Sequence, residues 1–268
     1  MNPKCFFCSG YCVAFILLQV KISTSEKWTV ITSTGHLVAT VGGQAELSCQ
    51  LSPSQSAENL EVQWLKGKSS KLVYLFRGGH EVNEDIAREY VNRTEFVKTA
   101  IGKGKLTLRL HNISVSDDGT YQCLFKGENF SDVASINLSV AALGLKTQVH
   151  VQASNIKGLV VECNSGGWFP EPQMEWRNSK GEVIPHLSKS YSQDEAKLFH
   201  MEMTLFLPIQ HRSNVTCYIF NSLLGKGRHT NITLTGSLPG VATVTVCEYH
   251  IQACVPPVTV TEAAEERR

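Results

Sequence analysis

The chain has 268 residues, with 25 Lys and Arg against 24 Asp and Glu, a formal net charge of +1, and no long block of one sign. This length suits one large domain or two domains of about 100 residues each. The balanced charge argues against nucleic acid as a partner, because binding a phosphate backbone requires a concentrated basic surface.

The N-terminus carries a short apolar stretch. Lys4 precedes sixteen uncharged residues, CFFCSGYCVAFILLQV, and the small residues 23–25 follow Lys21. This pattern is typical of a secretory signal peptide, and we predict that residues 1–25 form one, cleaved near Ser25. A membrane-anchoring helix is the alternative, but the stretch is shorter than the ~20 residues that a span requires.

Secretion decides how the cysteines and the Asn-x-Ser/Thr sequons are interpreted. Cys5, Cys8 and Cys12 lie in the signal peptide, so their metal-like spacing is discarded with it. Six cysteines remain, and an even number in a secreted chain predicts disulfides. The same compartment allows N-glycosylation at the six sequons, which are Asn92, Asn112, Asn129, Asn137, Asn214 and Asn231.

Short segments throughout the chain alternate apolar and polar residues. Half-buried antiparallel strands have this period of two, and no segment shows a helical stripe of useful length. Inward-facing residues of the first half are Ala45, Leu47, Cys49, Leu60, Val62, Trp64, Leu106, Leu108, Leu110, Tyr121, Cys123 and Phe125. The pattern repeats after a short linker, AALGLK at 141–146, which leaves little room for domain motion.

Each half carries a cysteine, a tryptophan and a second cysteine: Cys49, Trp64 and Cys123, then Cys163, Trp176 and Cys217. The second cysteine follows the first by 74 residues in the first half and by 54 in the second. A tryptophan packed on an inter-sheet disulfide is the core of the immunoglobulin fold. We therefore predict an all-β protein with two tandem immunoglobulin sandwiches and the disulfides Cys49–Cys123 and Cys163–Cys217. The longer interval makes 26–141 variable-type, and the shorter one makes 142–235 constant-type.

The sequence DDGTYQC refines the first domain. Tyr121 lies two residues before Cys123, the position of the tyrosine corner. Asp117 requires a cation if it is buried, and Arg93 is the expected partner. The alternative is that Asp117 is a solvated surface residue.

The stretch GWFPEPQMEW, 167–176, leads from a strand to the core Trp176 of the second domain. Pro170 and Pro172 fix a corner there, and Phe169–Pro170 is a candidate cis peptide. We expect Trp168 and Phe169 to close the end of the sandwich, with the linker as a possible contact surface.

GWFPEPQMEW with its preceding Cys163, together with YVNRTEF, GKGKLTLRL and DDGTYQC, resembles the butyrophilin group of the immunoglobulin superfamily. AELSCQLSPSQSAENLEVQW, NIKGLVVECNSGGWFPEPQMEW and HRSNVTCYIFN are similar to the Skint (selection and upkeep of intraepithelial T cells) family. The resemblance covers about 26–235. It implies extracellular display and an action on T cells, particularly γδ T cells, with no enzyme activity and no cofactor.

Catalytic and metal-binding motifs are missing from the sequence. The nine histidines show no paired metal spacing, and there is no nucleophile elbow or phosphate-binding glycine loop. A binding module is the favoured interpretation, and such domains act through loops and the exposed face of the variable-type sheet. The predicted partner-binding face consists of Gln63, Leu65, Tyr74, Phe76, Gln122, Leu124 and Phe130. The alternative for the apolar members is that they cover the sheet edge.

The expected partner is a cell-surface receptor on T cells, with a homodimer or a related butyrophilin-like chain as a further possibility. Two other functions stay open at this point. One is a butyrophilin-like co-inhibitory regulator of T-cell receptor signalling and cytokine production, and the other is a homophilic adhesion module.

The tail, 236–268, departs from the family, whose members typically continue into transmembrane helices. Its longest uncharged run, Gly236–Cys247, has 12 residues, too few for a span. We expect a tail without a transmembrane span, mostly disordered, on a protein secreted through the secretory pathway. A truncated transcript of a membrane protein is the alternative. Cys247 and Cys254 are predicted either to form a local disulfide or to link two chains.

Overall fold

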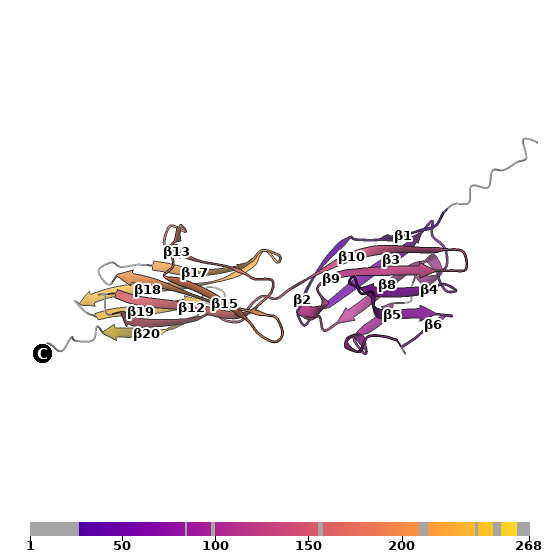
Figure 1. Cartoon of the computed structure of the whole chain (residues 1–268). Helices are drawn as coiled ribbons and strands as arrows, with labels where there is room; N and C mark the ends of the chain where they lie inside the picture. The colour runs from indigo at the N-terminus through magenta and orange to yellow at the C-terminus, as the bar shows by residue number, and fades with distance from the viewer. Residues whose placement is uncertain are drawn as a thin grey trace, which may run out of the picture.

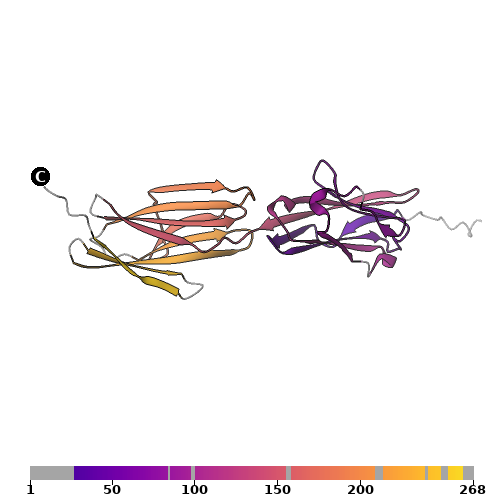
Figure 2. The same cartoon turned by 90° about the horizontal axis from the view of Figure 1, so that it is seen from below.

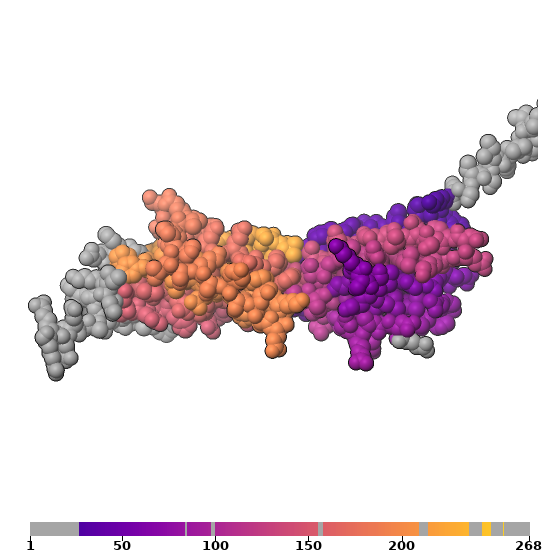
Figure 3. Space-filling model, in the orientation of Figure 1, coloured from indigo at the N-terminus to yellow at the C-terminus, as the bar shows by residue number. Residues whose placement is uncertain are grey.

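The computed structural model describes residues 27–83, 85–97, 100–154, 158–208, 214–238, 241–248 and 253–261. The predicted signal peptide, residues 1–25, lies outside these ranges. Within them, two β-sandwiches follow one another along the chain. They lie end to end with one connection between them (Figures 1 and 2), and the described part of the molecule forms an elongated rod (Figure 3). Within the described ranges, no helix is long and apolar enough to cross a membrane.

The first sandwich consists of two sheets. The back sheet has the order β1-β3-β8-β7, with β1 (Thr29–Thr32), β3 (Gln44–Ser52), β8 (Lys105–His111) and β7 (Thr94–Val97). The front sheet has the order β2-β10-β9-β4-β5-β6, with β2 (His36–Thr40), β10 (Ser131–Ala141), β9 (Gly119–Lys126), β4 (Glu61–Lys66), β5 (Lys71–Arg77) and β6 (His80–Glu81). Three 3₁₀ turns connect strands: η1 (Arg88–Tyr90), η2 (Ile101–Lys103) and η3 (Val115–Asp117).

The core of the first sandwich lies between these sheets. A disulfide joins Cys49 on β3 to Cys123 on β9, and Trp64 on β4 is fully buried beside them. The strands form here because their alternating apolar residues cover one side only. In β8, for example, Leu106, Leu108 and Leu110 are buried and the residues between them are not. β5 and β6, which the longer spacing between the cysteines accommodates, widen the front sheet.

The second sandwich repeats the plan. One sheet has the order β11-β12-β16-β15, with β11 (Gln148–Ser154), β12 (Gly158–Trp168), β16 (Phe199–Pro208) and β15 (Ser188–Gln193). The other has the order β14-β13-β17-β18-β19-β20, with β14 (Val183–Ile184), β13 (Gln173–Asn178), β17 (Asn214–Asn221), β18 (Lys226–Leu238), β19 (Val241–Glu248) and β20 (Ala253–Thr261). Cys163 is bonded to Cys217, and Trp176 is buried between the sheets.

The strands β19 and β20 correct the expectation of a mostly disordered tail. β18 would otherwise leave an unpaired edge, and β19 pairs with it in antiparallel register. Val244 of β19 is buried in the core of the second sandwich. The hairpin is closed by a disulfide between Cys247 and Cys254, which lie opposite one another on its two strands. The alternating run VATVTV is therefore a strand because the sheet supplies a partner edge; residues 262–268 lie outside the described ranges.

The connection between the sandwiches is bonded to the GWFPEP corner. Ala142 and Phe169 exchange backbone hydrogen bonds of 2.7 and 3.2 Å. The buried Asn221 donates through Nδ2 to both of their carbonyl oxygens, at 3.1 and 2.8 Å. Phe169 itself packs against the core of the first sandwich. The peptide bond between Phe169 and Pro170 is cis, as the sequence suggested.

Trp168 continues this junction into the second sandwich. Its indole is fully buried and donates through Nε1 to Oγ of Ser165 at 3.0 Å. Gly144 of the linker lies so close that a Cβ there would collide with the indole ring. Arg228 Nε donates to the carbonyl oxygen of Gly144 at 2.7 Å. The linker is therefore packed and hydrogen-bonded on several sides.

Replacing Asn221 with Ala is predicted to loosen this junction. The change removes one of the two donors to each of these carbonyl oxygens, which keep their backbone hydrogen bonds. The free energy of unfolding should therefore fall by about 1–3 kcal/mol for the two lost hydrogen bonds. Trypsin should then cleave faster after Lys146, the last residue of the linker. Ser222→Ala, at the exposed neighbouring residue, is the matched control. Equal cleavage rates in the two variants would show that Asn221 does not restrain the linker.

Candidate partner-binding face

The outward side chains of the front sheet form rows across its strands. Gln63 on β4 lies opposite Leu75 on β5 and Leu124 on β9, and Leu124 in turn lies opposite Val133 on β10. In the next row, Leu65 lies opposite Gln122. The structure thus places four of the predicted face residues, Gln63, Leu65, Gln122 and Leu124, side by side and partly exposed.

Val133 joins this surface although the sequence analysis did not select it. Its side chain is 46% exposed and adjoins Leu124. The alternation in SDVASIN would have identified it, because Ile136 is buried and Val133 lies on the opposite side of the strand.

Tyr74 and Phe76 do not belong to the exposed face, which corrects their prediction. They lie opposite Trp64 and Val62, both of which point into the core. Both aromatic side chains are buried, and each ring contacts Phe96 of the back sheet at 5.3 and 5.4 Å between centroids. The sequence was ambiguous here because β5 contains five consecutive apolar residues, Leu72–Phe76, the last four of which are buried.

A group of charges borders the face at the end of β4 far from the linker. Glu61 accepts hydrogen bonds of 2.6 Å from Arg77 Nε and from Gln63 Nε2, and Lys126 Nζ lies 3.7 Å away. The hydrogen bond from Arg77 is the main cause that lowers the pKa of Glu61. The carboxylate therefore stays ionised, so the apolar row has a fixed polar border.

Phe130 occupies the turn between β9 and β10, beyond this border. It is partly buried against the first core, and its ring meets Trp28 edge to face at 5.9 Å. Trp28 is 39% exposed. Asn129 is exposed in the same turn, so an attached sugar would stand beside this aromatic pair.

The base of β9 is fixed by a buried ion pair. Arg93 NH2 pairs with the carboxylate of Asp117, and NH1 lies 3.4 Å from Oδ1. Arg93 also donates to the carbonyl oxygens of His111 and Asn112, at 3.2 and 2.9 Å. Asp117 is fully buried and accepts from the backbone N–H of Ser114 at 2.8 Å.

The phenol of Tyr121 completes this base. Its hydroxyl donates to the carbonyl oxygen of Asp117 at 3.0 Å, which is the tyrosine-corner contact. Burial is the main cause that raises the pKa of Tyr121. The phenol is therefore a neutral donor, and it holds the turn before β9 in place.

The sequons lie at different kinds of position. Asn92 and Asn112 are turn residues with φ of 61° and 48°. Such a left-handed conformation favours asparagine for its own sake. Asn137 lies on β10, Asn214 begins β17, and Asn231 lies on β18.

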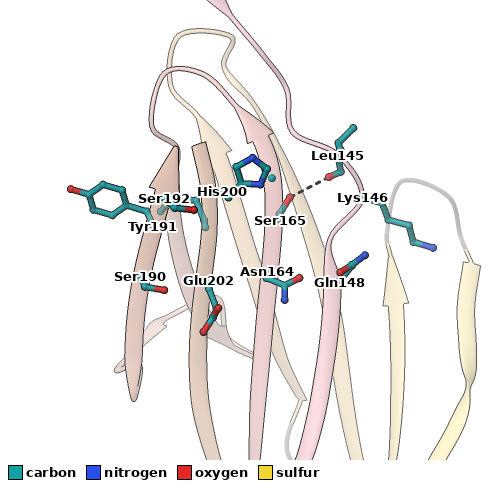
Figure 4. Close-up of a pocket in the computed structure, with 12 residues that line it drawn as sticks. Leu145, Lys146, Gln148, Asn164, Ser165, Ser190, Tyr191, Ser192, His200 and Glu202 are labelled. Carbon is teal, nitrogen blue, oxygen red and sulfur yellow. Dashed lines mark hydrogen bonds between the residues drawn. The ribbon is translucent and has the colours of Figure 1, made fainter. Parts of the chain in front are cut away.

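A cavity of about 520 Å³ lies over the outer face of the second sandwich (Figure 4). It is bordered by β11, β12, β16 and β15 and by the linker residue Leu145. Its side chains are mostly hydroxyls, amides and single charges, including Gln148, Asn164, Ser190, Ser192, His200 and Glu202. Across the described residues, no group of three or more His, Cys, Asp and Glu could hold a metal ion.

Known proteins share this arrangement. The family model for the immunoglobulin V-set domain matches residues 32–141, and the model for the Ig-C domain of butyrophilin subfamily 3 member A2-like proteins matches 143–229. The crystal structure of bovine butyrophilin superposes with a TM-score of 0.72 and 34% identity, over 78% of this chain and 99% of that one.

Curated relatives are more similar in sequence. Selection and upkeep of intraepithelial T-cells protein 7 of Mus musculus is 56% identical over 238 residues, which are 89% of this chain and 60% of the relative. Protein 1 of the same name from Macaca fascicularis is 45% identical over 86% of this chain and 65% of its own length. The chain thus spans less than two thirds of these relatives.

The fold and the comparisons define an immunoglobulin-superfamily ectodomain with a V-set domain followed by a butyrophilin-like Ig-C domain. Within this class, the chain belongs to the Skint family of butyrophilin-like proteins.

Removing the cation of the buried ion pair is predicted to destabilise the first domain. Arg93→Ala leaves the Asp117 carboxylate buried without its partner, so unfolding should become easier by about 3–5 kcal/mol. Arg109→Ala is the control, because Arg109 pairs with carboxylates on the exposed outer side of the back sheet and should cost no more than about 1 kcal/mol. Chemical denaturation of the ectodomain measures both. Similar losses in the two variants would contradict a special role for the buried pair.

Proposed function

We propose that this chain is an extracellular ligand that regulates T cells, in particular γδ and intraepithelial T cells, through protein contacts of its first domain. The observation that carries the proposal is the similarity to proteins named for the selection and upkeep of intraepithelial T cells. These relatives extend beyond the matched region, so the activity of a whole relative is carried over only as part of this proposal.

The front sheet is the contact surface that we propose. Leu124 on β9 and Val133 on β10 provide apolar area, and Gln63 and Gln122 provide amide hydrogen-bonding groups beside them. The ionised group of Glu61, Arg77 and Lys126 gives the surface a charged border. An apolar centre with a polar rim is typical of protein–protein interfaces.

The rigid base of β9 supports the same proposal. β9 carries Gln122 and Leu124, and its start is held by the Arg93–Asp117 pair and by the Tyr121 hydroxyl. A surface whose side chains stand on fixed strands loses less conformational entropy on binding. On the back sheet, Arg109 forms salt bridges with Glu46 and Glu95, so its outer face is charged rather than apolar.

A single substitution can place a sugar on the proposed contact surface. Val133→Asn creates the sequon Asn-Ala-Ser on the front face opposite Leu124, and we expect it to reduce staining of a γδ T-cell line by labelled ectodomain at least tenfold. Gln50→Asn creates Asn-Leu-Ser on the outer face of the back sheet and should leave staining within twofold of wild type. An αβ T-cell line tests the cell type in parallel.

Two controls make this result interpretable. Val133→Gln changes the side chain without adding a sequon, and mass spectrometry reports whether the new sites carry sugar. Unchanged staining by a fully glycosylated Val133→Asn ectodomain would reject the front face as the contact surface. Ectodomain that self-associates at micromolar concentration and loses this association in the same variant would instead indicate homophilic adhesion.

The natural sequon in the turn between β9 and β10 gives a further prediction. A sugar on Asn129 would stand beside Trp28 and Phe130 and hinder an end-on approach. Asn129→Gln should then increase staining of the partner cell line. If mass spectrometry finds Asn129 unmodified, this idea fails and Phe130 becomes a candidate contact.

A further inference from the structure

Each sandwich contains the same kind of hydrogen bond, from a threonine on one strand to a sequon asparagine on the neighbouring strand. In the first sandwich, Thr120 Oγ1 on β9 donates to Oδ1 of Asn137 on β10, at 2.7 Å. In the second, Thr216 Oγ1 on β17 donates to Oδ1 of Asn231 on β18, at 2.8 Å. Both asparagines stand directly opposite their threonines in the antiparallel register.

This hydrogen bond orients the asparagine carboxamide and so sets the direction in which an attached sugar extends from the sheet. The carboxamide of asparagine carries its oxygen and its nitrogen on opposite sides of the Cβ–Cγ axis, and the nitrogen receives the sugar. Because the Asn137 oxygen faces β9, its nitrogen faces the other neighbour of β10. That neighbour is β2, the edge strand of the front sheet.

We propose that Thr120 is a positioning residue, which directs an N-linked glycan on Asn137 over β2 and away from the front face. The consequence for binding rests on the function proposed above, whereas the direction of the sugar does not. Gln122 and Leu65 form the next row of the face beyond Thr120. A sugar that leaned the other way would cover this row.

The surface of β2 suits a sugar. His36 lies opposite Asn137, and its Nε2 is 2.8 Å from Oγ of Ser139, so polar groups are available to sugar hydroxyls. Val38 lies next along the same outer side of β2 and is 46% exposed. The C–H groups on one face of a sugar ring can cover such an apolar side chain. The edge position of β2 leaves room for the rest of the glycan beside the sheet.

Asn231 repeats the geometry in the second sandwich. Its oxygen faces β17, so its nitrogen faces β19, where Cys247 lies opposite. The same pairing thus directs a sugar away from the central strands of both sandwiches. The recurrence makes it harder to attribute the Thr120 contact to an incidental cross-strand pair.

Hydroxyl-radical footprinting with and without removal of N-glycans by PNGase F tests the direction of the sugar without any receptor. In wild-type ectodomain, glycan removal should raise oxidation of His36 and Val38 at least twofold and leave Leu65 unchanged. Thr120→Val keeps the branched shape but removes the hydroxyl, so the protection should spread to Leu65. Thr120→Ser retains the hydroxyl and should behave as wild type.

Staining of the γδ T-cell line tests the consequence. Thr120→Val should reduce staining several-fold, and Thr120→Val combined with Asn137→Gln should restore it, because the freed sugar is then gone. Asn137→Gln alone should stain at least as well as wild type. A loss of staining that the double variant does not restore would mean that Thr120 acts through the strand itself and would overturn the proposal.

The two readouts separate the two proposals. An Asn137 without sugar, protection of Leu65 in wild type, or the same footprint in Thr120→Val as in wild type would each overturn the steering role of Thr120. If the footprint shifts as expected but neither Val133→Asn nor Thr120→Val changes staining, the steering stands and the front face is not the contact surface.

Discussion

The carboxamide of Asn221 holds the two sandwiches together as one rod. It is buried where the linker meets the GWFPEP corner, and it donates to a carbonyl oxygen on each side, at Ala142 and Phe169. Trp168 occupies the space that the missing side chain of Gly144 leaves open. Because the linker is packed in this way, the two sandwiches lie end to end with a bonded connection between them (Figure 1).

The front sheet is likewise held by contacts on its inner side, whereas the side chains on its outer side are partly exposed. The disulfide and Trp64 join it to the back sheet, and Tyr121 and Asp117 hold the start of β9. The aromatic side chains of β5, Tyr74 and Phe76, are buried in this core. The outer side therefore keeps only moderate apolar area, at Leu65, Leu124 and Val133, among polar side chains.

The second sandwich differs from the first at its edges. The hairpin of β19 and β20 extends the sheet beyond β18, and β20 reaches across to contact β11 of the opposite sheet. An unpaired edge strand is a site of unwanted association, so covering it protects the domain. The Cys247–Cys254 disulfide ties the two strands of this cover.

The sequence by itself determined the two sandwiches, because strand alternation and the spacing of Cys49, Trp64 and Cys123 depend on local periodicity and a few large residues. It also indicated that Arg93 neutralises Asp117, since a buried charge needs a partner. Only the tertiary structure decided which side of β5 is inward, because five successive apolar residues carry no period. Tertiary pairing likewise decided whether the tail forms strands, since a segment such as VATVTV becomes a strand only where another strand offers an open edge. The direction of the Asn137 carboxamide depends on a threonine 17 residues away that pairs with it across two strands, and no local pattern specifies that contact.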